Sequence, residues 1–389
     1  MNLKKIFSTL AVASMLVACG GNDTSSGNTS FKIGTSGPLT GDNAVYGNAV
    51  KNAVELAVEE VNAKGDIKLE FKMEDDQADP EKAPTAYGTL KDWGMQIGLA
   101  TVTSGAGAAV SQNYTDDETF ALTPSSSSTT VIYSDADNTQ SYKYVYQMCF
   151  TDPNQGLASA DYLKEHTELG TKVAVIYKSD DNYSTGIYQK FVSEAKKVGL
   201  DVVSETSFDN SSATDFNVQL KDAQSKGADI VYLPIYYQPA SLILTQANQM
   251  GYQPTFFGVD GMDGILTLDG FDTKLAEGVY LLTPFSADAT DELTANFVKN
   301  YKEKYGETPN QFAADAYDSI YAIYNALEAG KATPDMTNSE LADILIKQFT
   351  TMTFDGITGN NVTWSENGEV SKSPKAVMIK DGVYVGVED

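Results

Sequence analysis

The chain contains no arginine, since all 27 of its basic residues are lysines. Lysine lacks the planar guanidinium group that holds a carboxylate or phosphate with two parallel hydrogen bonds. Any anionic group of a ligand must therefore be held by backbone N–H groups, hydroxyls or a lysine. With 53 acidic residues and a net charge of -26, the chain repels phosphate backbones, which makes nucleic acid a poor candidate partner.

Histidine and cysteine are also scarce. His166 is the only histidine and stands in a polar run typical of a solvated helix face, where nothing nearby resembles a site. This scarcity argues against Ser-His and Cys-His nucleophile pairs and against a metal held by imidazoles. We expect no metal ion and no cofactor. Cys149 lies alone in an apolar run, so we expect a buried, inert thiol rather than a disulfide.

The N-terminal residues predict a targeting signal. An apolar run over residues 6–18 follows Lys4 and Lys5 and is too short to span about 30 Å of hydrocarbon, so it is typical of a secretory signal peptide. Its last residues, Leu-Val-Ala before Cys19, form a bacterial lipobox. We predict a signal peptide over residues 1–18, a lipid on Cys19 and a flexible tether over residues 19–30. The alternative is an ordinary cleaved signal with an incidental cysteine.

Beyond the tether, short apolar runs alternate with helical patterns. Residues 31–34, 69–73 and 96–101 have strand patterns, whereas residues 50–64 and 79–91 have helical ones, the latter with Asp79-Pro80 as its start. A second series follows. Its predicted strands lie at residues 172–177, 202–203, 229–233, 255–258 and 278–282, and its helices at residues 184–198, 213–225 and 239–250.

This alternation predicts parallel sheets with right-handed crossovers and helices on both faces. We therefore predict two doubly wound α/β lobes, with a boundary near residues 150–152. Helical stretches at residues 291–305 and 310–329 fit either lobe on pattern alone. Because ligands of open α/β sheets bind beyond the C-terminal strand ends, two facing lobes predict a shared cleft.

Two neighbouring strand ends of the first series carry small and hydroxyl residues. Residues 101–109 leave a strand and enter a helix, which exposes helix N-terminal amides and the Ser104 hydroxyl to a ligand carboxylate. The next strand is followed by Ser125, Ser126 and Ser127. The glycine spacing is not that of a dinucleotide or phosphate loop. A tight turn without a ligand, or a low-complexity loop, remains the alternative.

Three strand ends of the second series carry aromatic and acidic residues. Tyr183, Tyr236 and Asp260 each follow a predicted strand. Aromatic rings there could cover an apolar ligand, and a carboxylate could meet an ammonium group. The alternatives are packing between the lobes for the tyrosines and a solvated surface position for the aspartate.

From residue 31 to 389 the chain resembles the branched-chain amino acid (Leu/Ile/Val)-binding proteins, which are type I solute-binding components of ABC importers. The resemblance rests on landmarks that occur in order: Gly37-Pro38-Leu39-Thr40-Gly41, Tyr46-Gly47, Thr103-Ser104-Gly105, Pro124-Ser125-Ser126-Ser127, Gln155-Gly156, Tyr236-Tyr237, Gly258-Val259-Asp260-Gly261 and Ala316-Tyr317-Asp318. It implies a type I periplasmic binding protein fold with three hinge crossings, near residues 150–152, 282–284 and 354–358. The implied first lobe comprises residues 31–150 and 284–355, and the second comprises residues 151–283 and 356–389.

The resemblance also implies roles for individual residues. Ser104 and the backbone at Ser125 would hold the ligand carboxylate, with Ser127 donating from its hydroxyl, and Asp260 would pair with the ammonium. The run before Ser104 is longer than usual in the family, so the register of that turn is open by one or two residues. The other implied pocket positions are Tyr46, Asp152, Tyr183 and Tyr236.

These observations predict a monomeric, lipid-anchored protein of the cell envelope, in the periplasm or on the outer face of the cytoplasmic membrane. It would capture a small amino acid, with branched-chain amino acids first, and deliver it to an ABC permease without catalysing a reaction. One alternative is the same fold with an amide, urea or an aromatic acid as ligand. Another is an envelope hydrolase that uses acid pairs such as Asp75-Asp76 or Asp180-Asp181.

Overall fold

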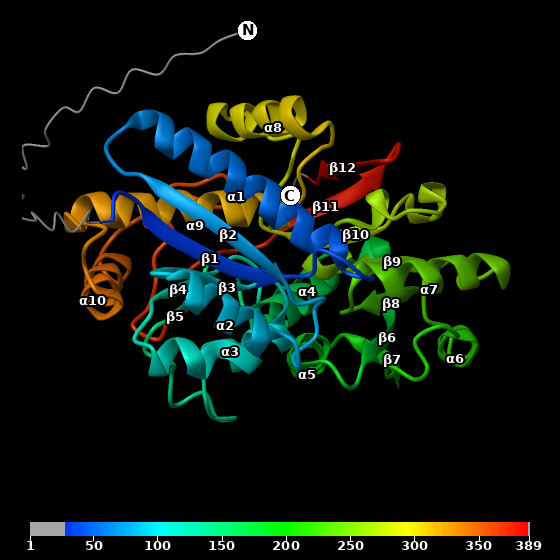
Figure 1. The fold of residues 1–389 in the computed structure, drawn as a ribbon. Coiled ribbons are helices and arrows are strands. Elements are labelled where there is room, and N and C mark those ends of the chain that lie inside the picture. The colour runs from blue at the N-terminus through cyan, green and yellow to red at the C-terminus, as the bar shows by residue number, and fades with distance from the viewer. Residues whose placement is uncertain (1–27, 388–389) are drawn as a thin grey trace, which may run out of the picture.

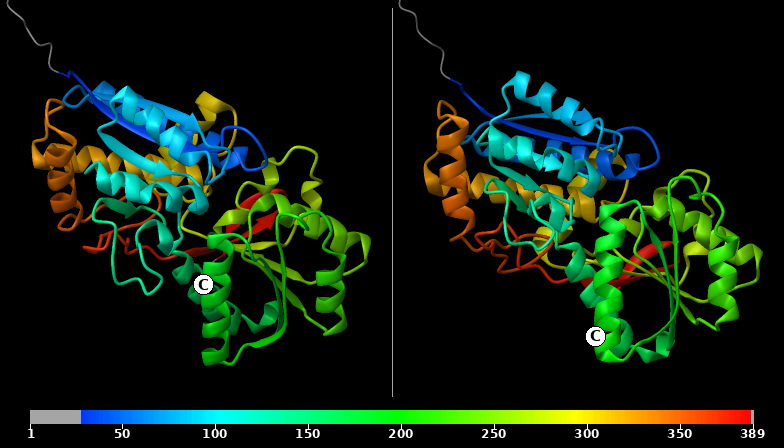
Figure 2. Two further views of the ribbon diagram at one scale, coloured as in Figure 1. Left: turned by 60° about the horizontal axis from the view of Figure 1, so that its bottom comes forward. Right: turned by 90° about the horizontal axis from the view of Figure 1, so that it is seen from below.

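The computed structural model describes residues 28–387 and arranges them as two α/β lobes side by side (Figures 1 and 2). Cys19 and the predicted signal peptide lie outside the described residues. Among residues 28–387, no helix is long and apolar enough to cross a membrane.

The first lobe is built on a parallel sheet with the strand order β2-β1-β3-β4-β5. Helix α1 buries a stripe of small apolar residues at helical spacing, as predicted. Helices α2 and α3 cover the opposite face, where Tyr87, Leu90 and Tyr114 belong to a separate core cluster. The elements are β1 (Phe31–Gly37), α1 (Ala44–Lys64), β2 (Leu69–Asp75), α2 (Ala83–Trp93), β3 (Ile97–Thr101), α3 (Ser104–Asp116), β4 (Ala121–Thr123), η1 (Thr129–Val131) and β5 (Val145–Gln147).

The second lobe contains a seven-stranded sheet with the order β12-β11-β10-β9-β8-β6-β7. Alternate residues of β6 enter different cores, with Val173 and Val175 facing α4 and α5, and Ala174 and Ile176 facing α6 and α7. Its elements are α4 (Asp152–Glu165), η2 (Thr167–Leu169), β6 (Lys172–Lys178), α5 (Asn182–Val198), β7 (Asp201–Phe208), α6 (Asn217–Ser225), β8 (Ile230–Leu233), α7 (Tyr237–Gln249), β9 (Thr255–Gly258), η3 (Asp260–Met262), η4 (Ile265–Thr267), η5 (Thr273–Ala276), β10 (Tyr280–Thr283), β11 (Lys375–Lys380) and β12 (Val383–Gly386).

Three helices return to the first lobe after β10. They are α8 (Glu292–Tyr305), α9 (Gln311–Gly330) and α10 (Asn338–Phe349). Helix α9 packs along α1, and the Tyr305 hydroxyl of α8 donates to the Asn52 carbonyl of α1 at 2.7 Å (Figure 1). The two helical stretches that fit either lobe on pattern alone thus lie beside α1.

The segment after α10 also lies against the first lobe. Trp364 packs on Phe349, and its indole N–H donates to the Gln147 carbonyl of β5 at 2.7 Å. The Gln147 N–H in turn donates to the Gly368 carbonyl at 2.9 Å. These contacts place residues 364–368 beside β5, whereas the sequence prediction assigned them to the second lobe. We therefore propose that the third crossing comes at residues 371–374, after the predicted residues 354–358.

Several predicted elements differ from the observed ones. The helix predicted from Asp79 begins at Ala83, because the Asp79 carboxylate accepts the Glu81 N–H in a separate turn. The final hairpin β11-β12, whose strand β11 pairs antiparallel with β10, was not predicted. Neither was α10, whose N-terminus is closed by a capping box between Thr337 and Glu340.

Candidate functional site

The predicted site residues lie at or just beyond the C-terminal ends of strands in both sheets. Because those ends meet at one edge of a parallel sheet, the topology brings them towards the space between the lobes. Tyr46 stands on α1 after β1, Ser104 after β3, Ser125 and Ser127 after β4, Asp152 after β5, Tyr183 after β6, Tyr236 after β8 and Asp260 after β9.

The hydroxyls of the first lobe fall into two groups. Ser125 donates to a backbone carbonyl at 2.7 Å, and Ser104 accepts a backbone N–H at 3.1 Å. By contrast, the Ser127 and Thr103 hydroxyls are buried and have no hydrogen-bond partner among the described residues. Thr103 is the N-cap residue of α3, yet its side chain does not cap the helix. Two orphaned hydroxyls and a helix N-terminus therefore lie where an anionic group could be held.

Two buried carboxylates lie on the side of the second lobe. Asp152 is fully buried, neither of its oxygens has a hydrogen bond of normal geometry, and its N–H donates to the Ser127 carbonyl at 3.0 Å. Burial raises the pKa of Asp152 well above its ordinary value; the nearby Ser127 side chain opposes the shift and the Asp260 carboxylate adds to it. Such a carboxylate is costly to ionise unless a cation joins it.

Asp260 is held more firmly. Its Oδ1 accepts the Tyr183 hydroxyl at 2.5 Å, and the same hydroxyl accepts the Gly261 N–H at 2.8 Å. Burial raises the pKa of Asp260 to about 7, against the lowering effect of the Tyr183 hydrogen bond. A bound ammonium group would reverse this shift, because an opposite charge favours the ionised form.

Tyrosine side chains connect the two lobes between the hydroxyls of the first and the carboxylates of the second. The Tyr46 hydroxyl donates to the Gly261 carbonyl and accepts the Tyr237 N–H at 3.2 Å. The Tyr46 ring packs against Phe312 at 4.3 Å and edge-on against Tyr236 at 5.5 Å. These residues form an aromatic wall, and their contacts hold α1 of the first lobe against the loop after β9 of the second.

Tyr236 also connects the two sides of the site. Its ring stacks on Tyr183 at 4.8 Å. Burial raises the pKa of Tyr236 well above its ordinary value, and the Ser104 backbone opposes that shift. A series of contacts thus runs from Tyr46 of the first lobe through Tyr236 and Tyr183 to Asp260.

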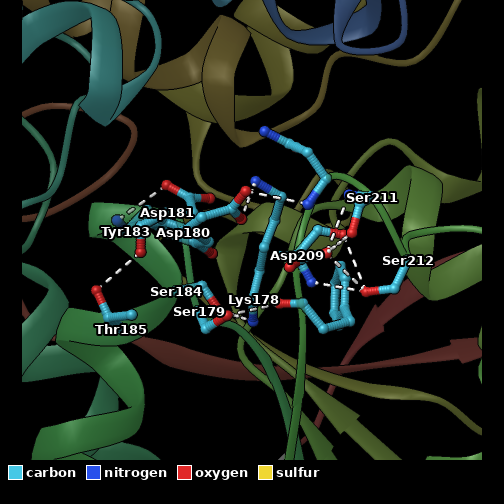
Figure 3. A network of polar contacts seen from close by, with 12 residues as sticks. Lys178, Ser179, Asp180, Asp181, Tyr183, Ser184, Thr185, Asp209, Ser211 and Ser212 are labelled. Atoms are coloured by element: carbon cyan, nitrogen blue, oxygen red, sulfur yellow. Dashed lines mark hydrogen bonds and ion pairs between the residues drawn. The ribbon is translucent and has the colours of Figure 1, made fainter.

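A groove of about 460 Å³ opens beside these residues, and we call it the cleft groove. The first lobe contributes Thr103 and Gly105, and the second contributes Lys178, Asp181 and Tyr236. Figure 3 shows its second-lobe wall, where Lys178 pairs with Asp180 at 2.8 Å and Asp181 accepts the Tyr183 N–H at the start of α5. The cleft groove meets the candidate site at Thr103 and Tyr236.

The acid pairs considered for a hydrolase have structural partners. Asp75 accepts the Leu39 N–H at 2.9 Å and the Thr40 hydroxyl at 2.6 Å, and Asp76 accepts the Ser36 hydroxyl at 2.8 Å. Asp180 pairs with Lys178, as described above. These bonds fasten loops at strand ends, so they account for both pairs without catalysis.

The two scarce residue types also have structural surroundings. Cys149 is a buried free thiol, as predicted, and burial raises its pKa well above the ordinary value. His166 ends α4 rather than lying on a helix face; its ring stacks on Tyr162 at 4.0 Å and its Nδ1 lies 2.9 Å from Glu168. In residues 28–387 no group of three or more His, Cys, Asp or Glu side chains could hold a metal ion.

Three residues of the site were not predicted individually. They are Thr103, with its orphaned hydroxyl, Phe312, against Tyr46, and Gln155, whose Oε1 accepts the Asp260 N–H at 3.4 Å while its Nε2 has no partner in the described chain. Gln155 follows Asp152 by three residues on α4, and this helical spacing was the available signal. Thr103 lies in the turn at Ser104, whose register the sequence left open by one or two residues.

Known proteins resemble the chain over nearly its whole length. The model of the periplasmic binding protein family matches residues 30–382. The chain belongs to this family. A leucine-, isoleucine-, valine-, threonine- and alanine-binding protein of Pseudomonas aeruginosa is 24% identical over 372 residues, which cover 95% of this chain and 93% of the relative.

Two solved structures show the same two-lobed type I fold. The branched-chain amino acid transporter substrate-binding protein LivJ of Streptococcus pneumoniae, in complex with isoleucine, has a TM-score of 0.81 at 26% identity, covering 92% of this chain and 99% of that one. A solute-binding protein of an ABC transporter from R. palustris, in complex with benzoate, has a TM-score of 0.79 at 18% identity, covering 92% and 95%. The predicted family and fold class are confirmed.

Proposed function

We propose that the protein is a lipid-anchored, extracytoplasmic solute-binding protein that captures an α-amino acid between its lobes and delivers it to an ABC permease. Branched-chain amino acids are the first candidates, because the similar LivJ structure holds isoleucine. Capture by closure of the lobes follows from a ligand that contacts both of them, since it favours the arrangement in which both sets of contacts form.

One observation carries this proposal: the unpartnered polar atoms of the site are complementary to a zwitterion. The Thr103 hydroxyl stands at the N-terminus of α3 and the Ser127 hydroxyl lies near Asp152; neither hydroxyl and neither Asp152 oxygen has a hydrogen bond of normal geometry among the described residues. Buried polar groups are otherwise nearly always hydrogen-bonded, so such a cluster indicates the place of a ligand. The carboxylate would bind the hydroxyl side without arginine, and the ammonium would bind Asp152 and Asp260.

A ligand panel tests this proposal. Leucine, isoleucine or valine is expected to raise the melting temperature of the full chain in detergent, because a ligand at 100 times its Kd stabilises the native state by about 2.7 kcal/mol. Acetamide, urea and benzoate are the comparison ligands, followed by differential scanning calorimetry. A rise with benzoate but with none of the amino acids would replace the proposal with an aromatic acid carrier, for which the tyrosine wall is suited.

Ser127 and Ser125 provide a matched pair of variants. Ser127→Ala removes an orphaned hydroxyl and is expected to weaken leucine binding by about 1 to 3 kcal/mol, because it leaves a charged ligand group short of a donor. Ser125→Ala removes a hydroxyl that already bonds a backbone carbonyl, so its effect on affinity should be smaller. Isothermal titration calorimetry measures both. Equal affinity of the Ser127 variant and the parent would move the carboxylate elsewhere.

The lipid anchor is tested separately at Cys19, in the lipobox of the sequence. Cys19→Ser removes the thiol that would carry the lipid, so the variant should leave the membrane fraction for the soluble fraction. Fractionation of cells followed by immunoblotting measures the change. A variant that still sediments with membranes in high salt would show that another feature retains the protein there.

A further inference from the structure

A second groove, of about 710 Å³, opens beside the start of α1, and we call it the side groove. Five segments of the chain form it: the start of α1, the segment from the loop after η3 into η4, residues 287–288, the end of α8 with the α8–α9 connection, and the β11–β12 hairpin. Its volume is in the range of small-molecule sites. The side groove and the cleft groove share no lining residue.

Both lobes contribute walls to the side groove. Val45 of α1 comes from the first lobe, whereas Leu266, Val383 and Val385 come from the second. The two lobes approach each other closely at Gly264. A Cβ atom added to this glycine would lie 2.9 Å from the Val45 Cγ1, and its φ is +111°. An occupant of this groove would therefore contact the two lobes at once.

The apolar walls surround one buried acid. Asp263 lines the side groove, is only 5% exposed and has an Oδ1 without a hydrogen-bond partner among the described residues. Its Oδ2 accepts the Gln311 N–H at the start of α9 at 2.8 Å. Tyr384 is close by, with its hydroxyl accepting the Gly264 N–H at 3.1 Å.

The other charges of the side groove make it acidic. Asp288 and Glu307 line it together with Lys302. Asp288 accepts the Gly386 N–H at 3.3 Å, and Glu307 accepts the Tyr301 hydroxyl at 3.4 Å, so both are engaged in the fold. Burial raises the pKa of Asp263 to about 6, against the lowering effects of the Gln311 N–H and of the nearby Tyr384 side chain. A cation beside its free oxygen would relieve this cost.

We propose that the side groove is a second binding site, which takes a small organic amine with its ammonium group at Asp263 and its apolar body against the valine and leucine walls. The class follows from the chemistry of the groove: a carboxylate with an unsatisfied oxygen, a surplus of acidic groups and apolar sides. The site does not depend on the ligand proposed for the cleft. Its occupant would contact both lobes, so it would also shift the equilibrium between different arrangements of the two lobes.

Tryptamine is a suitable probe, because it joins an ammonium group to a flat apolar ring. Its neutral analogue tryptophol replaces the amine with a hydroxyl. We expect the full chain in detergent to bind tryptamine about tenfold or more tightly than tryptophol, measured by saturation-transfer NMR titration at pH 7.5. Asp263→Asn should remove this preference. Equal binding of both probes, or no saturable binding of tryptamine, would overturn the proposal.

Two exposed valines give a control that does not disturb the core. Val383 lies in the side groove at 56% exposure, and Val218 lies on α6 at 77% exposure. Val383→Lys should weaken tryptamine binding about tenfold or more by placing a cation beside the ammonium, while Val218→Lys should leave it unchanged. Asp260→Asn separates the two sites: loss of tryptamine binding in that variant, with retention in Val383→Lys, would place the probe in the cleft and overturn the proposal.

Discussion

Replacing Asp260 with asparagine is expected to weaken binding of the amino acid ligand by about tenfold or more. The variant keeps the shape of the side chain and removes the charge that would face the ammonium group. Loss of one partner of a buried charge pair typically costs about 2 to 5 kcal/mol, and each 1.4 kcal/mol is about a factor of ten in affinity. Titration calorimetry of the parent and the variant with leucine at pH 8 measures the change.

The pH dependence of ligand affinity provides a second readout. The raised pKa of Asp260, about 7, means that part of the unliganded protein carries a proton there near neutral pH. Binding of an ammonium group needs the ionised form, so affinity should fall as pH decreases below about 7, with release of a proton on binding. Asp260→Asn should flatten this profile, and Asp152, whose pKa is also raised, accounts for what remains.

Without ligand, the Asp260→Asn substitution should not destabilise the protein, although it weakens ligand binding. An acid whose pKa is raised on folding binds its proton more tightly in the native state, so its contribution to stability decreases as pH rises through the folded pKa. At pH 8 the Asp260→Asn variant should therefore melt at the same temperature as the parent or higher. If it binds leucine as tightly as the parent, another group holds the ammonium, and Asp152→Asn should show the loss instead.

The alternation of apolar runs predicted the parallel strands of both sheets, because each run is short and local. Residues 172–177 predicted β6, which spans Lys172–Lys178, and Asp260 lies directly beyond β9 as the pattern required. Helix α10 and the hairpin β11-β12 were not predicted. Helix α10 did leave a signal, since its buried residues Leu341, Leu345 and Phe349 follow helical spacing after a capping box, and the prediction overlooked it. The hairpin depends on pairing of β11 with β10, which is distant in the sequence, and such pairing leaves no periodic signal in one sequence.

The candidate site, like the fold, was predicted only in part. Strand ends identified the polar and aromatic residues of both lobes, but not which of their hydroxyls are free. Ser125 and Ser127 look equivalent in the sequence, and only the fold shows that the Ser125 hydroxyl bonds a carbonyl while the Ser127 hydroxyl has no partner in the described chain. Burial is likewise a property of the fold, so the raised pKa of Asp152 could not be derived from its neighbours in the chain.

A buried ion pair lies where the chain makes its proposed third crossing. The Lys372 ammonium group donates to Asp315 Oδ1 of α9 and to the Thr358 hydroxyl, both at 2.6 Å. The Thr358 hydroxyl donates to Asp318 at 2.5 Å. The side chains of Lys372 and Asp315 are only 1% and 3% exposed. Burial raises the pKa of Asp315 to about 6, and Lys372 opposes the shift.

Replacing Lys372 with methionine is therefore expected to lower the free energy of unfolding by about 3 to 5 kcal/mol, because it leaves the Asp315 carboxylate buried without its cation. Urea denaturation of the unliganded protein at pH 8 measures the loss. At pH 5 the loss should be smaller, since Asp315 in the variant can take up a proton in the native state and the buried charge disappears.

The double variant Lys372→Met/Asp315→Leu is the matched control. It removes both charges, and replacing a buried ion pair with apolar residues of similar volume is often neutral or stabilising. We expect it to recover most of the stability lost by the single variant, which would show that the loss comes from the unpaired carboxylate. If the double variant is no more stable than Lys372→Met, the loss comes from packing of the lysine side chain or from the buried Asp318 carboxylate, which also loses the nearby Lys372 charge. If neither variant is destabilised, the pair contributes nothing to stability and the third crossing is held by other contacts, such as those of Trp364.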